Sequence, residues 1–326
     1  MLISKAPAKL ILAGEHGVLY HVPAITTSIH WFTTCLWQKA DTSSLHLAKE
    51  KPFFYSTNDL QAHWQLMTQR HQHWQEHPSS KILHTLYDLP LTVLAWWQVH
   101  YPLEQLSCRI DSEIPMGSGL GSSASLIIAM LRGLADWHQI YFSQADFQRI
   151  ATELEGFAHG RSSGLDVAAI LQDQPMQWQN KQAEALTVST LSGYLVHTGS
   201  PSSSTADCVG HVRQHHASNH LLWEKMSQMV NQLKQQIQAQ QDPSNSIRQL
   251  QTMLTALGIV PQRVQDFTHA IEAKGWAGKQ CGAGSISGDA GGFYWLLTYE
   301  DPQEICQAFG YPYWSLSTVN ALVAKT

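Results

Sequence analysis

Apolar and polar positions along the chain predict strands at both ends and in the middle. The segment Leu2–Ala13 is apolar and is predicted to be a strand with a break at Pro7. Apolar residues at alternate positions in Thr26–Leu47 predict antiparallel strands. Two further strands are expected at Leu106–Ile114 and Phe293–Leu297.

Longer apolar stretches and helical periodicity predict that helices fill most of the remaining chain. The expected helical segments are residues 56–80 (a helix or a polar lobe), Lys81–Tyr101 with an interruption near Pro90, Ala124 to about Trp137, Ser143–Ala158, and residues 219–274 with breaks near Asp242 and at Gly258–Pro261. Strands and helices together predict a mixed α+β protein.

A run rich in glycine and serine lies between a predicted strand and a predicted helix. It reads Pro115-Met116-Gly117-Ser118-Gly119-Leu120-Gly121-Ser122-Ser123-Ala124-Ser125. Its glycines allow tight turns that present successive N–H groups, and the helix N-terminus adds free amides and a positive dipole end. The run therefore predicts a phosphate site, although an ordinary strand-to-helix connection has a similar composition. It is not a P-loop, because G-x-x-x-x-G-K-[ST] does not occur, and it matches a Rossmann fingerprint poorly.

Composition narrows the class of protein. The 326 residues are 44% hydrophobic, enough for one large or two modest domains. The net charge of −5 and the scattered basic residues argue against a nucleic acid or an anionic membrane as partner. Five cysteines without a C-x-x-C pair indicate neither a disulfide framework nor a zinc site. With no signal-peptide core and no apolar run long enough to span a bilayer, a cytoplasmic enzyme is expected.

Histidine and tryptophan are unusually frequent, with 18 and 12 residues. The histidines show no metal-ligand spacing with carboxylates on one helical face, so most are interpreted as surface composition and metal binding is not expected. The Trp96-Trp97 pair lies in an apolar helical stretch and is expected in the core.

Charged and small residues in three other segments accompany the glycine run. Lys9 precedes an apolar strand that ends in Gly14-Glu15-His16, and a salt-bridged strand end would explain this pattern. Glu155 and Asp166 flank His159-Gly160-Arg161-Ser162-Ser163-Gly164, where a solvated helix face and a cap would explain them. Near the C-terminus, Lys279-Gln280-Cys281-Gly282-Ala283-Gly284 precedes a strand and also fits a glycine-rich hairpin.

Together, these segments resemble the motifs of the GHMP family of small-molecule kinases, in the same order. The glycine run matches the second motif, P-x-x-x-G-L-G-S-S-A, at every position. The segment around Lys9 resembles the first motif, P-G-K-x-x-L-x-G-E-H, with Ala8 in place of glycine. The segment from Lys279 resembles the third motif, K-x-x-G-A-G-x-G-G, but departs from it at Ser285–Ser287.

Two pairs are similar to the mevalonate kinase branch of this family. They are Glu15-His16 and His159-Gly160; the latter lies in a segment resembling E-x-x-x-H-G-x-P-S-G-x-D, with Ser162 in place of proline. Phosphomevalonate kinase, homoserine kinase, diphosphomevalonate decarboxylase and a non-catalytic sensor on the same fold remain as alternatives. The resemblance favours ATP-dependent phosphorylation of the primary hydroxyl of mevalonate.

The resemblance also implies a fold and a domain organisation. It implies a two-lobed α+β fold, with an N-terminal lobe like ribosomal protein S5 domain 2 and a ferredoxin-like C-terminal lobe. The expected domains are residues 1–180, with the phosphate loop, and residues 181–326, which complete the substrate site. Family members are often homodimers, so a homodimer is expected too.

The roles of individual residues are likewise implied by the resemblance. Asp166 would deprotonate or align the substrate hydroxyl beside Lys9, and Mg²⁺ would be held by Ser123 and Glu155. Substrate contacts would come from Glu15, His16 and Thr205. The phosphates of ATP would lie against Gly117, Ser118, Gly119, Leu120, Gly121, Ser122, Ser123, Ala124 and Gly284.

Overall fold

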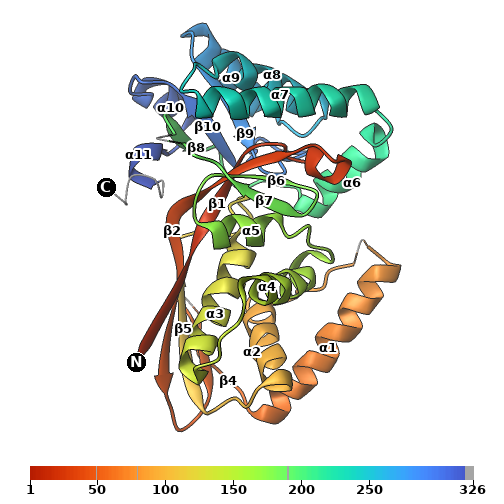
Figure 1. Cartoon of the computed structure of the whole chain (residues 1–326), viewed down its shortest axis with the longest axis vertical. Helices are drawn as coiled ribbons and strands as arrows, with labels where there is room; N and C mark the ends of the chain where they lie inside the picture. Colours follow the sequence, from red (N-terminus) through yellow and green to blue (C-terminus); the bar gives the residue numbers. More distant parts are fainter. Residues whose placement is uncertain (49, 79, 189–190, 320–326) are drawn as a thin grey trace. The chain divides into compact units, whose positions relative to one another are not determined.

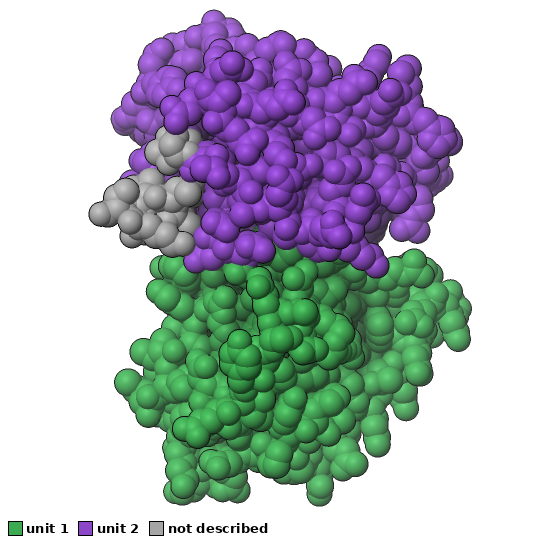
Figure 2. Space-filling model, viewed as in Figure 1, with its two compact units in different colours: residues 1–8, 31–114, 122–171 green, residues 9–30, 115–121, 172–326 purple. Residues whose placement is uncertain are grey.

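Two compact units make up the chain in the computed structural model, which describes residues 1–48, 50–78, 80–188 and 191–319 (Figure 1). Each unit is assembled from segments that are distant in sequence (Figure 2). Unit 1 comprises residues 1–8, 31–114 and 122–171, and unit 2 comprises residues 9–30, 115–121 and 172–326. The predicted division near residue 180 stays a prediction.

The described strands lie at both ends and in the middle of the chain. They are β1 (Leu2–Ala13), β2 (Ala24–Lys39), β3 (Ser44–Leu47), β4 (Phe53–Phe54), β5 (Leu106–Ser112), β6 (Met176–Gln179), β7 (Gln182–Ala185), β8 (Tyr194–His197), β9 (Ala277–Cys281), β10 (Phe293–Leu297) and β11 (Tyr313–Ser315).

The described helices fill most of the intervals between the strands. They are the 3₁₀ helix η1 (Gly17–Tyr20) and the α-helices α1 (Thr57–Glu76), α2 (Asp88–His100), α3 (Ser122–His138), α4 (Gln144–His159), α5 (Leu165–Gln172), α6 (Thr205–His216), α7 (His220–Gln238), α8 (Ser244–Ala256), α9 (Gln262–Ala273), α10 (Gln303–Phe309) and α11 (Leu316–Val319). This content confirms the predicted α+β class.

Unit 1 packs a helical layer around one apolar core. Its part of β2 pairs antiparallel with β5, and β3 lies parallel to β5 on the other side. Helices α2, α3 and α4 pack against one another, and α1 packs against α2 (Figure 1). Both Trp96 and Trp97 are buried in this core, as the sequence predicted. Small residues permit the close packing, because a Cβ at Gly133 would lie 2.0 Å from the indole nitrogen of Trp37.

Unit 2 contains a four-stranded antiparallel sheet with the order β11-β8-β10-β9. Helices α8 and α9 pack against β9, and α7 packs against α8 (Figure 1). The breaks predicted in residues 219–274 are confirmed by the ends of α7, α8 and α9. The two short strands β6 and β7 pair with each other, and β6 pairs with the start of β2.

Three predictions about local structure were wrong. Strand β1 continues through Pro7. Among the described strands β1 pairs with β2, and an edge strand tolerates proline because its missing N–H can face away from the partner. Pro90 does not interrupt a helix, because α2 begins at Asp88 and places Pro90 in the first turn, where N–H groups lack intrahelical partners. Within Thr26–Leu47, β3 pairs parallel with β5 and is not an antiparallel neighbour of β2.

Two findings bear on the protein's environment. All five cysteines are buried and free, which agrees with the prediction of no disulfide framework. Among the described residues, no helix is both long and apolar enough to cross a membrane.

Candidate functional site

The glycine loop of unit 2 has a backbone conformation that favours glycine at three positions. Gly117, Gly119 and Gly121 have φ angles of 70°, 80° and 74°, which side chains with a Cβ rarely adopt. The Ser118 hydroxyl donates to the carbonyl of Pro115 at 2.6 Å, and the Lys9 amide donates to the carbonyl of Leu120 at 3.0 Å. The loop is therefore anchored to β1 at Lys9, the lysine of the first motif.

The first-motif turn at the end of β1 is confined by its surroundings. Gly14 has φ 90°, and a Cβ there would lie 2.3 Å from the carbonyl oxygen of Pro23. His16 also has a positive φ, 55°, in the left-handed half of conformational space that costs energy for a residue with a side chain. Tertiary contacts must hold this turn in place.

A buried ion pair provides one such contact. The Nζ atom of Lys279 lies 2.5 Å from Oε1 of Glu15, and the two side chains are 0% and 2% exposed. Lys279 also donates to the carbonyl of Gln280 at 2.8 Å. The pair ties the first-motif turn to strand β9 of the third motif. The predicted contact of Glu15 with substrate stays a prediction.

His16 provides the second contact and has a definite tautomer. Its Nε2 lies 2.9 Å from the carbonyl oxygen of Ala283, and because a carbonyl oxygen only accepts, Nε2 must carry the proton. Burial lowers the pKa of His16, against the opposing effect of the Ala283 bond, so the ring is neutral at pH 7. Nδ1 is then an acceptor, and it is buried without a partner among the described residues. It can accept a hydrogen bond from a ligand hydroxyl.

A small pocket of unit 2 collects residues from the glycine loop, the third motif and the segment before α6. It is lined by Gly117, Ser118, Gly119, Pro201, Ser203, Thr205, Cys281, Ala283, Gly284 and Gly291. Thr205 is the first residue of α6 and not its cap, since Ser204 caps the helix and accepts from the amide of Asp207 at 3.1 Å. The structure thus places four of the predicted ATP contacts in the same pocket as Thr205. These four are Gly117, Ser118, Gly119 and Gly284.

The third motif departs from the family pattern at Ser285–Ser287, and the structure shows what these serines do. The Ser285 hydroxyl donates to the carbonyl of Ser287 at 2.7 Å and accepts from the amide of Ser203 at 3.1 Å. The Ser285 amide donates to the carbonyl of Ile259 at 2.9 Å. The altered segment therefore fixes the loop that precedes Thr205.

Unit 1 holds the predicted metal and base residues. Ser122 and Ser123 begin α3, followed by the buried Ala124. Glu155 is 4% exposed near the end of α4, and its Oε2 accepts a short hydrogen bond from the Ser162 hydroxyl. Asp166 lies in the first turn of α5.

The loop from Glu155 to Asp166 is stabilised by its own serines. The Ser162 hydroxyl accepts from the amide of Gly164 at 3.0 Å, and the Ser163 hydroxyl accepts from the amide of Leu165 at 3.3 Å. The serine that replaces the family's proline therefore holds Glu155 and shapes the turn into α5. The approach of Lys9 to Asp166, and the metal-binding roles of Ser123 and Glu155, stay predictions.

Sequence reasoning missed Lys279 and Ser162 as members of the site. The lysine was visible as the first residue of the third motif, but nothing in the sequence pairs it with Glu15, 264 positions away.

The expectation that the histidines lack metal-ligand spacing was also wrong. His73, Glu76 and His77 at the end of α1 place ligand atoms within 4.8 Å of one another, all on exposed side chains.

Known proteins support the motif assignment. The family described as GHMP kinases N terminal domain matches residues 89–174. A mevalonate kinase of Thermococcus sibiricus is 25% identical over 319 residues, covering 94% of this chain and 92% of the relative. A mevalonate kinase of Pyrococcus abyssi is 25% identical over 332 residues with the same coverage. The crystal structure of Methanococcus jannaschii mevalonate kinase has a TM-score of 0.78 and 17% identity, covering 96% of this chain and 97% of that one.

The matched domain, the three motifs in order and the relatives that align over most of the chain support assignment to the GHMP kinase superfamily. It is a phosphotransferase of that class. Within the superfamily it is similar to the mevalonate kinases, with which it aligns over nearly its whole length.

The tautomer of His16 leads to a prediction about pH. A folded-state pKa below the ordinary value means that the unfolded chain binds a proton which folded His16 resists, so stability falls as pH drops below about 6.5. Unfolding by urea between about pH 7.5 and 5.5 should show a shallower loss for His16→Gln than for the wild type.

Burial also lowers the pKa of four other histidines: His63, His138, His197 and His216. They contribute equally to the pH dependence of the unfolding free energy in both proteins, so their contributions cancel in the comparison. His269→Gln, at an exposed position on α9, serves as the control and should follow the wild type. Identical slopes for wild type and His16→Gln would contradict a neutral, buried His16.

Proposed function

We propose that the protein transfers the γ-phosphoryl group of ATP to the primary hydroxyl of mevalonate and forms 5-phosphomevalonate. The observation that carries this proposal is the junction in unit 2 of the glycine loop, the Glu15-His16 turn and the third motif. The neutral His16, with an acceptor nitrogen facing no described partner, suits a hydroxylated substrate. The mevalonate kinase relatives supply the substrate class.

Phosphoryl transfer needs positioning and charge stabilisation more than covalent chemistry from the protein. The amides of the glycine loop and the N-terminus of α3 would hold the phosphates of ATP. A carboxylate such as Glu155 and a hydroxyl such as Ser123 are oxygen ligands of the kind that Mg²⁺ prefers. The bound ion would neutralise charge on the phosphates. Asp166 would accept or orient the substrate proton, and Lys9 would stabilise charge on the transferred group.

A coupled assay of ADP release tests the proposal against its rivals. The purified protein is offered mevalonate, phosphomevalonate, galactose and homoserine in turn, with ATP and Mg²⁺. We expect turnover with mevalonate well above that with the other three. Turnover with phosphomevalonate alone would transfer the assignment to phosphomevalonate kinase, and measurable ATP binding without any turnover would favour a sensor.

Ser162 offers a sharper test of the metal site. Because its hydroxyl donates to the buried carboxylate of Glu155, Ser162→Ala removes one hydrogen bond that orients this carboxylate. Loss of such a supporting hydrogen bond typically weakens metal affinity or activity by about 10- to 100-fold. The Mg²⁺ concentration for half-maximal activity should therefore rise in Ser162→Ala.

The neighbouring Ser163→Ala is the matched control, because the hydroxyl of Ser163 accepts from the amide of Leu165, whereas that of Ser162 donates to Glu155. It should keep the Mg²⁺ dependence of the wild type. An equal Mg²⁺ requirement in Ser162→Ala and wild type would show that the Ser162 bond does not orient a metal ligand.

A further inference from the structure

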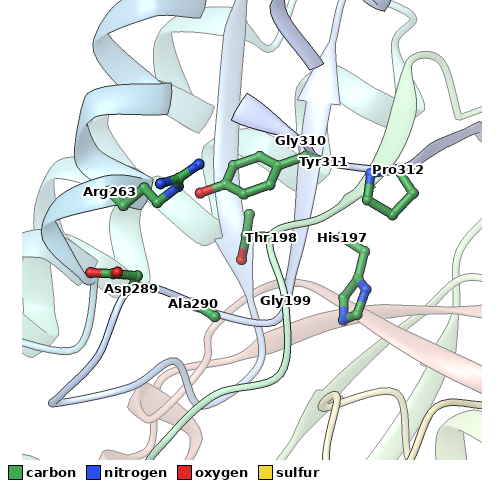
Figure 3. A pocket seen from close by; sticks show the side chains of 9 residues that line it. All are labelled: His197, Thr198, Gly199, Arg263, Asp289, Ala290, Gly310, Tyr311 and Pro312. Atoms are coloured by element: carbon green, nitrogen blue, oxygen red, sulfur yellow. The ribbon is translucent and has the colours of Figure 1, made fainter. Parts of the chain in front are cut away.

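Figure 3 shows the residues that line a second cavity of unit 2. This cavity has a volume of about 320 Å³ and shares no lining residue with the glycine-loop pocket. Its walls come from the end of β8 and the following turn, from α9, from Asp289 and Ala290 and from the chain between α10 and β11. The volume is at the lower end of the range for small-molecule sites.

Tyr311 supplies a buried hydroxyl at this cavity. The side chain is 7% exposed, and its oxygen makes no hydrogen bond of ordinary geometry to the described residues. Burial raises the pKa of Tyr311, and a weak hydrogen bond from the Arg263 guanidinium, together with its charge, opposes that rise. Buried polar atoms are nearly always hydrogen-bonded in proteins, so a hydroxyl without a well-formed bond to the described residues has capacity for a partner in the cavity.

Arg263 stands beside that hydroxyl. Figure 3 shows the two side chains directed toward each other at one end of the cavity, and the guanidinium carbon lies 5.9 Å from the ring centroid of Tyr311. One guanidinium nitrogen donates to the carbonyl of Phe309 at 2.9 Å, which uses one of five N–H donors. A guanidinium and a phenol that can both donate to one point form a site for an oxyanion.

The other end of the cavity is polar and carries no positive charge. The Nε2 atom of His197 is buried and has no partner among the described residues, and burial lowers the pKa of this ring. The exposed Asp289 lines the cavity on the side of Arg263. Its carboxylate disfavours a second negative charge on the ligand.

We propose that this cavity binds a small molecule with one anionic group, a phosphate or a carboxylate, held between Arg263 and Tyr311. The rest of the ligand is uncharged and polar and reaches His197. The proposal does not depend on the kinase assignment. Thr198 lines this cavity, and its hydroxyl donates to the carbonyl of Gly292 at 2.8 Å and accepts from the amide of Gly291 at 3.0 Å.

Isothermal titration with inorganic phosphate and with glycerol 3-phosphate, at constant ionic strength, tests the proposal. The titrations are repeated with a saturating non-hydrolysable ATP analogue, so that binding at the glycine loop is counted separately. In its presence, Arg263→Gln should weaken binding of both probes by roughly tenfold or more, as expected for loss of a charge-assisted hydrogen bond. Tyr311→Phe should weaken binding less, and Asp289→Asn should tighten it.

Arg248→Gln, on α8, is the matched control, since its guanidinium donates to the carbonyls of Gly275 and Trp276 away from the cavity. It should bind both probes like the wild type. Tyr311→Phe removes only a hydroxyl without a well-formed hydrogen bond to the described residues and should fold normally, which keeps the test valid if another variant is unstable. Tighter binding of glycerol 3-phosphate than of phosphate would identify an organic phosphate as the ligand class.

Three outcomes would overturn the proposal. They are no detectable binding of either probe at millimolar concentration, equal binding in wild type, Arg263→Gln and Tyr311→Phe, and binding that the ATP analogue abolishes entirely. Kinase turnover in Arg263→Gln should equal that of the wild type. Failure of the anion site would therefore leave the proposed function untouched.

Discussion

Replacement of Asp166 by asparagine is expected to lower kcat with mevalonate by on the order of a hundredfold or more, while ATP still binds. Asparagine keeps the size of the side chain but cannot accept a proton from the substrate hydroxyl. A hundredfold loss corresponds to about 2.7 kcal/mol of transition-state stabilisation. The measurement combines steady-state turnover with equilibrium binding of a non-hydrolysable ATP analogue.

Asp146→Asn is the matched control for this substitution. Asp146 also lies in the first turn of a helix, α4, where it interacts with the cap Ser143 at an exposed position. Asp166 occupies the equivalent region of α5. Both variants lose a negative charge near a helix N-terminus, and so both lose the same interaction with the helix dipole. A loss of turnover confined to Asp166→Asn would therefore come from the missing proton acceptor. Near-normal turnover in Asp166→Asn would remove this residue from the mechanism.

Substitution of Lys279 by methionine is expected to destabilise unit 2 by about 3–5 kcal/mol. Methionine has a similar length but leaves the carboxylate of Glu15 without its 2.5 Å partner and almost without solvent. Since native proteins are stable by only about 5–15 kcal/mol, this loss should lower the urea midpoint and Tm strongly. Chemical denaturation followed by tryptophan fluorescence would measure it.

An exposed lysine gives the comparison. Lys274 is paired with Glu304 at 3.3 Å, with side chains that are 50% and 87% exposed, and Lys274→Met should remain close to the wild type. The double variant Glu15→Gln, Lys279→Met removes both charges and should recover part of the lost stability. If Lys279→Met were no less stable than Lys274→Met, the buried pair would not hold the first-motif turn.

Local sequence patterns predicted most of the elements, because each depends on residues that are near in sequence. Helix α4 follows its predicted range within a residue, since Ser143 caps it and apolar residues recur along one side. Strand β10 has the predicted bounds because five consecutive apolar or aromatic residues are all buried. Pro90 was misjudged because proline breaks a helix interior but fits its first turn, and the helix start at Asp88 was not recognised.

The sequence alone also determined the class of protein, because the glycine loop and its companion motifs require particular residue types at fixed spacing. Tertiary structure decided which distant residues meet. It pairs Glu15 with Lys279, and it places the carbonyl of Ala283 against His16, which fixes the tautomer of that ring. It brings the Ser162 hydroxyl to the carboxylate of Glu155, to which it donates a hydrogen bond. It also opened the cavity around Arg263 and Tyr311. Such contacts follow from how strands and helices pack across long separations, and no local pattern of apolar and polar residues encodes them.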